Sequence, residues 1–155
     1  LPLDATIKKQ IEALSRKQSL EVEFLPNAPS VWINANQLQL YQVLRHLFRN
    51  AGRAMFNRKR KKISVQTRLQ LAEKMVEILF QDFGPGVSEK VRPFIFQTSI
   101  STKGQKEEGG NGLLITRLLV EEMGGTIRLL PKEPGKGAVF SIKLPIAEPK
   151  SAGVE

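Results

Sequence analysis

One stretch of the chain has the residue types and spacing to meet a metal-bound polyphosphate. Residues 36–56 have the apolar period of a helix, and their polar flank carries side chains three, four and seven positions apart: His46, Arg49, Asn50 and Arg53. Such spacings bring side chains to one side of a helix. An Asn amide oxygen is a hard neutral ligand suited to Mg²⁺, and a guanidinium pairs with phosphate oxygens. Taken alone, Asn50 is more simply a surface or capping residue.

Two glycine-rich segments have features that suit the rest of a nucleotide. Asp82 ends an apolar strand pattern and is followed by Gly84 and Gly86. A carboxylate there can accept a hydrogen bond from an exocyclic amine, and glycines let the backbone lie against a flat base. Residues 109–112 lead into a helical pattern at Leu113, and backbone N–H groups at such a helix start bind anions. Each segment alone is also an ordinary turn or loop.

The elements that would position these residues alternate between helical and strand patterns. Helices are predicted over residues 4–17, 36–56 and 113–123, with Asn36 as the N-cap of the second. Strands are predicted over residues 20–25, 31–33, 63–69, 76–81, 126–130 and 138–144, and one or two helical turns over 88–94. We therefore predict an α+β fold: a two-layer α/β sandwich with a mixed, mostly antiparallel sheet of about five strands and three main helices on one face.

The composition excludes several classes of protein. Apolar residues make up 41% and charged residues 25% of the 155 residues, as in an ordinary globular domain. No apolar run approaches the roughly 20 residues that cross a bilayer, and residues 1–10 do not have the pattern of a signal peptide. The absence of cysteine excludes disulfides and cysteine-based sites. We expect a cytoplasmic domain whose parent protein is either soluble or membrane-anchored.

Much of the excess positive charge is local. The net charge is +9, from 24 basic and 15 acidic residues, and residues 58–62 are all Lys or Arg. Such a run is most often a solvated turn. Docking to an acidic protein is an alternative. Nucleic-acid binding is disfavoured, because the run has no interleaved aromatic residues and no recognisable binding motif accompanies it.

In this order and spacing, the segments resemble the catalytic ATP-binding domain of sensor histidine kinases, within the superfamily of gyrase, Hsp90, histidine kinase and MutL ATPases. Residues 42–51 are similar to the family's N box and residues 82–86 to its G1 box. Residues 96–103 resemble the F box and residues 110–113 the G2 box. The resemblance covers residues 20–145 and implies the Bergerat-type ATP-binding fold.

The resemblance implies a role for each residue of the pocket. Asn50 would bind the Mg²⁺ that bridges the phosphates. Asp82 would accept a hydrogen bond from the adenine amino group, with Gly84 and Gly86 shaping the pocket. Arg53 stands where the family usually has a phosphate-contacting lysine.

The resemblance also implies an ATP lid over residues 99–110. Thr102 and Lys103 end the F box, and Lys103 could close onto the phosphates. Gly110 and Gly112 would let the lid fold over the triphosphate, with Leu113 at the start of the following helix.

The sequence departs from the family's pattern at a few positions. His46 stands where many histidine kinases have Asn and gyrase-like ATPases have a catalytic Glu. Without that Glu, hydrolysis by a base-activated water is disfavoured, which favours a kinase over an ATP-driven clamp. We take His46 and Asn50 as candidate catalytic residues; for His46, contact with an Mg²⁺-bound water, with a phosphate or only with its neighbours all stay open. Residues 108–109, Asn111 and Ser99 differ from the usual lid residues.

The resemblance implies a part of a larger kinase. Residues 1–19 would be a helix connecting from a preceding domain, 20–146 the ATP-binding catalytic domain, and 147–155 a tail or linker. The domain would bind Mg-ATP and donate the γ-phosphate to a histidine on a separate dimerisation domain, which would phosphorylate a response regulator receiver domain. The only histidine, His46, lies inside the nucleotide site and is not the acceptor.

Two alternatives share this fold. One is a serine kinase of the anti-sigma-factor type, against which the Thr-Lys ending of the F box argues. The other is a degenerate, non-catalytic interaction module that docks through residues 58–62. In each case we expect no nucleic-acid partner and no direct membrane insertion by this domain.

Overall fold

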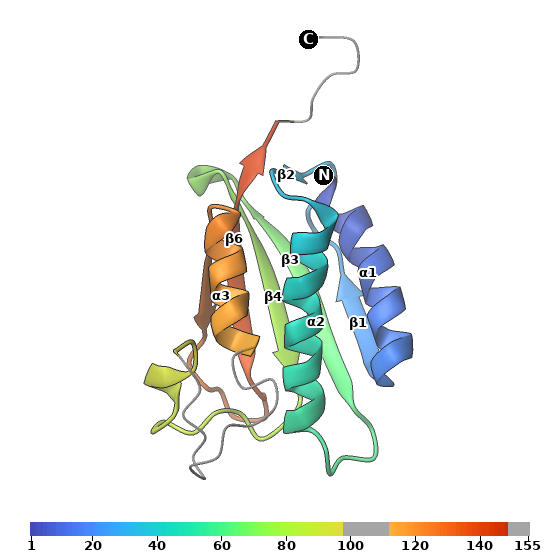
Figure 1. The fold of residues 1–155 in the computed structure, drawn as a ribbon, viewed down its shortest axis with the longest axis vertical. Coiled ribbons are helices and arrows are strands. Elements are labelled where there is room, and N and C mark those ends of the chain that lie inside the picture. The colour runs from blue at the N-terminus through green and yellow to red at the C-terminus, as the bar shows by residue number, and fades with distance from the viewer. Residues whose placement is uncertain (98–111, 149–155) are drawn as a thin grey trace.

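The computed structural model describes residues 1–97 and 112–148 (Figure 1). In those ranges the α-helices are α1 (Leu3–Gln18), α2 (Gln37–Ala54) and α3 (Gly112–Glu122). The strands are β1 (Glu21–Leu25), β2 (Trp32–Ile33), β3 (Lys62–Gln70), β4 (Met75–Asp82), β5 (Thr126–Leu129) and β6 (Val139–Ala147). Two short 3₁₀ turns, η1 (Leu71–Glu73) and η2 (Arg92–Phe94), complete the described elements.

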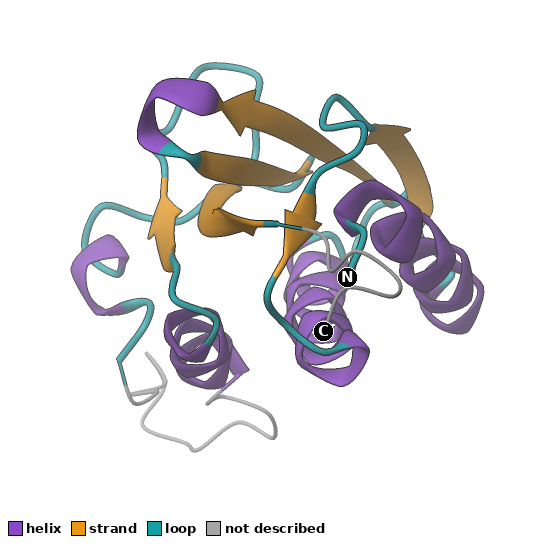
Figure 2. Ribbon diagram, turned by 90° about the horizontal axis from the view of Figure 1, so that it is seen from above, coloured by secondary structure: helices purple, strands orange, loops and turns teal. Residues whose placement is uncertain are grey.

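The strands form one sheet, with all three helices on one of its faces (Figure 2). The strand order is β1-β3-β4-β6-β2, and β5 also pairs with β6. Only β1 and β3 are parallel among the described pairs. The predicted α+β sandwich with a mixed, mostly antiparallel sheet is confirmed. The sheet has six strands rather than about five, because the two-residue β2 pairs with the end of β6.

Helix α2 begins and packs as its sequence dictates. The Asn36 Oδ1 accepts a hydrogen bond from the Gln39 N–H at 2.8 Å, and the Gln39 Oε1 accepts one from the Asn36 N–H at 3.2 Å. This reciprocal pair is a capping box, which fixes the first turn. The buried stripe of the helix is Leu40, Val43, Leu44, Leu47, Phe48 and Ala51. Because this stripe is held against the core, the polar flank of α2 has a fixed orientation.

Helix α1 shares the same core. Its apolar residues Leu3, Ile7, Ile11 and Leu14 are buried, and the helix packs against α2 and β1. The carboxylate of Asp4 accepts hydrogen bonds from the Ala28 N–H at 3.0 Å and from the Thr67 hydroxyl at 2.8 Å. The first helix is therefore tied to the sheet by polar bonds as well as by packing.

The side chains of β3, β4 and β6 alternate between the two faces of the sheet. Those that face the helices are buried: Ile63, Val65, Thr67, Val76, Ile78, Phe80, Phe140, Ile142 and Leu144. The rings of Phe48 and Phe80 meet across the helix–sheet interface with centroids 5.7 Å apart. Asp82 continues this inward-facing row at the end of β4. Burial of a carboxylate in an apolar core costs free energy unless hydrogen bonds compensate for it.

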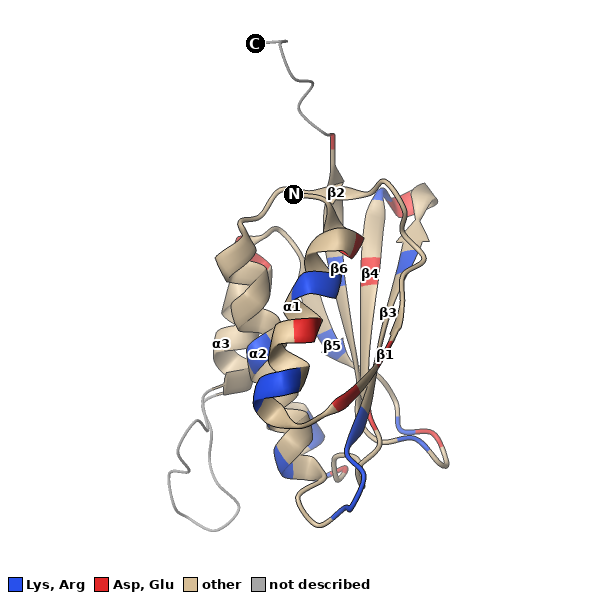
Figure 3. Cartoon of the chain, turned by 90° about the vertical axis from the view of Figure 1, so that its right-hand side faces the viewer, with Lys and Arg blue, Asp and Glu red and all other residues tan. Residues whose placement is uncertain are grey.

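Lys and Arg residues occur on α1 and on the turn that leads into β3 (Figure 3). Within the basic run of residues 58–62, Arg60 pairs with Glu21 at 2.9 Å and Lys62 with Glu23 at 3.1 Å. These pairs are solvent-exposed and so contribute little to stability. No helix in the described part of the chain is long and apolar enough to cross a bilayer.

We predict that Phe48→Ala lowers the free energy of unfolding by about 3–5 kcal/mol, because it leaves a cavity between α2 and β4. Denaturant-induced unfolding followed by circular dichroism measures the change. Phe56→Ala is the matched control: Phe56 lies just beyond the same helix and is 77% exposed. Its substitution should alter stability by no more than about 0.5 kcal/mol. Equal losses in the two variants would contradict the packing described here.

Candidate functional site

Asp82 is a buried carboxylate held by two backbone amides. Its side chain is 2% exposed, and its Oδ1 accepts hydrogen bonds from the N–H groups of Gly84 at 2.9 Å and Ala138 at 3.2 Å. Burial raises the pKa of Asp82, and the two N–H groups oppose that rise only in part. Within the described residues the Oδ2 accepts no hydrogen bond, so it is available to a ligand.

Gly137 is required by the position of Asp82. A Cβ at residue 137 would lie 2.3 Å from the Asp82 Oδ1, 2.6 Å from its carbonyl oxygen and 2.8 Å from the Gly84 nitrogen. No side chain fits in that space. The sequence analysis did not single out Gly137, because its contact with Asp82 spans 55 positions and leaves no local pattern.

The loop after Asp82 is held between α2 and the connection from β5 to β6. A Cβ at Gly84 would lie 3.1 Å from the Ala54 carbonyl oxygen, at the end of α2. Gly86 has a φ of +83°, which favours glycine. The Lys132 ammonium donates a hydrogen bond to the Pro85 carbonyl at 3.0 Å. Of the two predicted glycines of this loop, Gly84 is favoured by the close approach of Ala54 and Gly86 by its positive φ.

A cavity of about 360 Å³ opens between these elements. Its lining comprises Asn50, Ala54, Asp82, Gly86, Val87, Ser88, Val91, Ile95, Leu113 and Ala138. The structure thus brings together four predicted site residues from α2, the end of β4, the following loop and the start of α3. The apolar members near Asp82 suit a flat ring, and they were missed by sequence reasoning because scattered Val, Ile and Ala residues carry no motif.

The wall formed by residues 87–95 is fastened to the sheet. The Val91 N–H donates to the Ser88 carbonyl at 3.0 Å, which confirms the predicted helical turn. The Arg92 Nη2 donates to the carbonyl oxygens of Leu129 at 3.2 Å and Leu130 at 2.5 Å. Arg92 was not predicted as a site residue, yet it holds the cavity wall against the end of β5.

His46 lies beside the first residue of α3. A Cβ at Gly112 would be 3.5 Å from the His46 Nδ1, and the imidazole is half-buried. Burial lowers the pKa of His46, and the positive charges of Arg45 and Arg49 lower it further. The ring is therefore neutral at pH 7. His46 is not part of the cavity lining, nor is Arg53, which is exposed near the end of α2.

Three predicted site residues, Thr102, Lys103 and Gly110, lie outside the described residues, as does the whole predicted lid of residues 99–110. The described part of the chain contains no cluster of three or more His, Cys, Asp or Glu side chains that could hold a metal ion by itself. A divalent cation at Asn50 would therefore need most of its ligands from a bound molecule. A buried carboxylate at one end and an amide at the other suit a base with an exocyclic amine and an anionic tail.

Comparison with known proteins agrees with this chemistry. Residues 35–148 match the family model described as histidine kinase-, DNA gyrase B- and HSP90-like ATPase. The chain belongs to this family, and membership implies that it binds ATP.

Within this ATPase family, the proteins most relevant to the chain are sensor kinases. The chain is 34% identical over 134 residues to the sensor protein FixL of Bradyrhizobium diazoefficiens, covering 86% of the chain and 26% of FixL. The catalytic domain of histidine kinase ThkA matches with a TM-score of 0.73 and 26% identity over 94% of each chain. The fold of the mycobacterial sensor histidine kinase MprB matches with a TM-score of 0.78 at 21% identity, over 94% of this chain and 97% of that one. The chain is thus a sensor histidine kinase catalytic domain, and it spans about a quarter of the length of FixL.

We predict that Asp82→Asn weakens ATP binding about 10- to 150-fold, because a hydrogen bond to a charged group contributes about 1.5–3 kcal/mol. The amide oxygen can still accept from Gly84 and Ala138, while its NH₂ group faces the cavity and cannot accept from an amine. Removal of the buried charge should leave the domain at least as stable as the wild type. Isothermal titration and denaturant unfolding measure the two effects; a less stable variant with unchanged affinity would contradict this role.

Because the pKa of Asp82 is raised, we predict that both nucleotide affinity and the stability of the domain depend on pH. The ionised carboxylate is the form that would accept a hydrogen bond from the base, so wild-type affinity should fall as pH falls through that raised pKa, at a pH above the ordinary range for Asp. The contribution of Asp82 to the free energy of unfolding should instead rise as pH falls through this range. The reason is that the folded state, with the raised pKa, binds the proton more tightly than the unfolded state. Asp82→Asn should lose this part of the pH dependence of binding.

Proposed function

We propose that this domain binds Mg-ATP and donates the γ-phosphate to a histidine on a separate dimerisation domain of the same kinase. The observation that carries the proposal is that one cavity joins Asp82, the last residue of the central strand β4, to Asn50, on the flank of α2. Asp82 would select adenine through its amino group, and the apolar wall would enclose the ring. The triphosphate would then extend along α2 toward the start of α3.

Asn50 fits the metal that such a nucleotide carries. Its amide lines the cavity and, as a neutral oxygen ligand, suits Mg²⁺ that keeps phosphate and water ligands. When bound, Mg²⁺ would neutralise charge on the phosphates. The residues of the chain would orient the nucleotide and exclude water, which is most of what a phosphoryl transfer requires.

The remaining predicted residues have roles at the phosphate end. Arg53, one turn beyond Asn50, would contact phosphate oxygens, and Thr102, Lys103 and Gly110 would belong to the lid that covers them. Beside Gly112, the neutral imidazole of His46 would donate a hydrogen bond to a phosphate oxygen or accept one from a metal-bound water. Neither role gives His46 a covalent step.

The partners follow from the chemistry. A kinase that phosphorylates histidine needs an acceptor domain within reach, and a response regulator receiver domain would take the phosphoryl group from it. In this arrangement residues 1–19 would lie where a preceding dimerisation domain joins, residues 20–146 would form the catalytic domain, and residues 147–155 would be a tail or linker.

We predict that Asn50→Ala weakens binding of Mg-ATP but changes metal-free ATP binding by less than about threefold, because the substitution removes a metal ligand rather than a contact to the base. Titration of ATP with and without Mg²⁺ measures the difference. Asn57→Ala is the matched control, since Asn57 is an exposed residue on the turn beyond α2. Equal loss with and without the metal would contradict the assignment of Asn50.

A phosphotransfer assay tests the function itself. The domain is mixed with [γ-³²P]ATP and either a histidine dimerisation domain from its parent protein or a serine-bearing anti-sigma-factor antagonist. We expect acid-labile label on the histidine domain, none on the antagonist and none on the isolated chain. Transfer to serine would favour the anti-sigma-type alternative, and ATP binding without transfer to either would favour a non-catalytic module.

A further inference from the structure

The helix-free face of the sheet carries a second cavity that backs onto the nucleotide pocket. Strand register places Ser64, Gln81 and Val139 in one row across β3, β4 and β6, and Gln66 and Leu79 in the next. These side chains are half-buried. With the connection between β5 and β6 as a wall, they line a concavity of about 330 Å³, within the size range of small-molecule sites.

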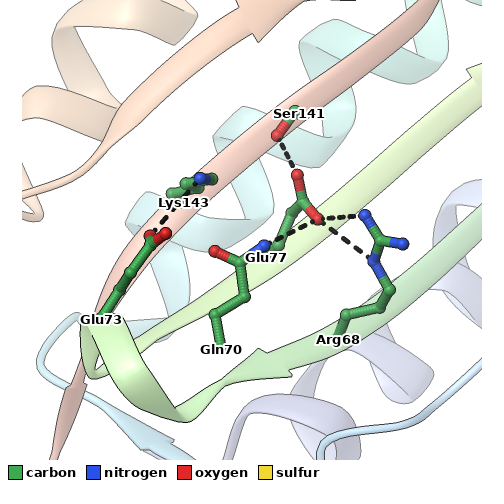
Figure 4. Close-up of polar contacts among 6 residues, drawn as sticks. All are labelled: Arg68, Gln70, Glu73, Glu77, Ser141 and Lys143. Carbon is green, nitrogen blue, oxygen red and sulfur yellow. Dashed lines mark hydrogen bonds and ion pairs between the residues drawn. The ribbon is translucent and has the colours of Figure 1, made fainter.

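One residue that lines this cavity, Arg68, has its guanidinium held by Glu77 (Figure 4). The Arg68 Nη2 and Nε donate to the Glu77 Oε1 at 2.6 Å and 3.2 Å, and Ser141 donates to the Glu77 Oε2 at 2.5 Å. Glu77 is 4% exposed although it lies on the open face. Burial by itself would raise the pKa of Glu77, but the bonds from Ser141 and Arg68 outweigh it and lower the pKa. The Arg68 side chain remains 52% exposed and lines the cavity, and the edge of its guanidinium that carries Nε and Nη2 is bound to Glu77.

Other groups in the cavity are also ready to donate hydrogen bonds. The side chains of Ser64, Gln66 and Gln81 have no hydrogen-bond partner within the described residues. Their hydroxyl and amide groups surround an apolar floor formed by Leu79 and Val139. This combination suits a small molecule with an anionic oxygen group and an apolar body.

The charges on this face also favour an anion. Its carboxylates are already paired: Glu77 with Arg68, Glu133 with Lys136 at 2.8 Å, and Glu73 with Lys143 at 3.5 Å. Arg128, which register places on the same face, forms no ion pair in the described part of the chain. Arg128 therefore adds positive charge to this face, besides the exposed edge of Arg68.

The two cavities share their structural parts. Gln81 lines the outer cavity and the next residue, Asp82, lines the nucleotide pocket. Likewise, Val139 lines the outer cavity and Ala138 lines the nucleotide pocket. The connection between β5 and β6 also serves both sides. Its residues Pro131, Glu133 and Lys136 line the outer cavity, whereas Lys132 holds Pro85 and Gly137 packs against Asp82.

We propose that the outer cavity is a second ligand site, for a small organic carboxylate, and that its occupancy is coupled to the nucleotide pocket through residues 131–138. The carboxylate would bind the exposed edge of Arg68 and the amide of Gln66 or Gln81, with its apolar body on Leu79. A ligand that orders the shared connection would also order the backbone around Asp82. The coupling rests on the proposed function, whereas the site itself does not.

Hexanoate is the probe, with hexanol and hexylamine as probes of the same length and different head group. In NMR spectra of the ¹⁵N-labelled chain, hexanoate should shift the amides of Gln66, Leu79, Gln81 and Val139. Hexanol and hexylamine should bind at least about tenfold more weakly, because neither pairs with a guanidinium. Equal responses to the three probes, or hexanoate shifts confined to the nucleotide pocket, would overturn the proposal.

Two variants separate the site from the stability of the sheet. Gln66→Glu places a negative charge beside Arg68 without touching Glu77 and should weaken hexanoate about tenfold or more. The double variant Arg68→Gln with Glu77→Gln removes both charges of the ion pair together and leaves no unpaired buried carboxylate, so the sheet should fold and hexanoate binding should be lost. Arg58→Gln, which removes a cation from the basic turn, is the control and should bind as the wild type does. Wild-type affinity in Gln66→Glu would overturn the site.

Coupling is tested in the wild type by titrating ATP with and without saturating hexanoate. We expect ATP to bind about fivefold more tightly with hexanoate, and hexanoate to gain the same factor from ATP, because coupling free energies are reciprocal. Unchanged affinities would overturn the coupling. If ATP does not bind under either condition while hexanoate still shifts its four amides, the proposed function fails and the carboxylate site stands.

Discussion

The carboxylate of Asp82 is the point on which this site depends. It ends a strand whose other inward-facing residues are apolar, and two backbone N–H groups, from Gly84 and Ala138, make its burial tolerable. The bond from Ala138 joins the end of β4 to the residue before β6, and the close approach there requires glycine at position 137. The other oxygen of the Asp82 carboxylate accepts no hydrogen bond within the described residues, and the residue lines the cavity. The rest of the pocket is arranged around it.

Helix α2 sets the other end of the pocket. Its capped start and buried apolar stripe leave it no freedom to rotate, so Ala54, Asn50 and His46 occupy successive turns, each about 6 Å further from Asp82 along the helix. Ala54 contacts the glycine loop, Asn50 lines the cavity and His46 lies beside the start of α3. One rigid element therefore presents Ala54, Asn50 and His46 in order along the pocket.

The sequence predicted those features of the fold that depend on residues close together in the chain. The period of α2, its Asn36 cap and the order of strands and helices follow from local sequence patterns. Asn50 and Asp82 were singled out by the order of three segments along the chain and by the family resemblance. Contacts between distant segments were missed: Gly137 against Asp82, Arg92 on the carbonyl groups of β5, and the apolar cavity wall have no signal of their own. Glu77 was likewise invisible, since an acidic residue in a strand looks solvent-exposed until its partners on neighbouring strands are known.

The central claim is that adenine nucleotide binds between Asp82 and Asn50. The most direct measurement is an NMR titration of the ¹⁵N-labelled chain with Mg²⁺ and a non-hydrolysable ATP analogue. The account predicts that the largest shifts occur at the Gly84 and Ala138 amides, which donate to Asp82, and at the Asn50 side-chain amide, with no comparable change along α1. Saturable binding that leaves these three groups unshifted would contradict it.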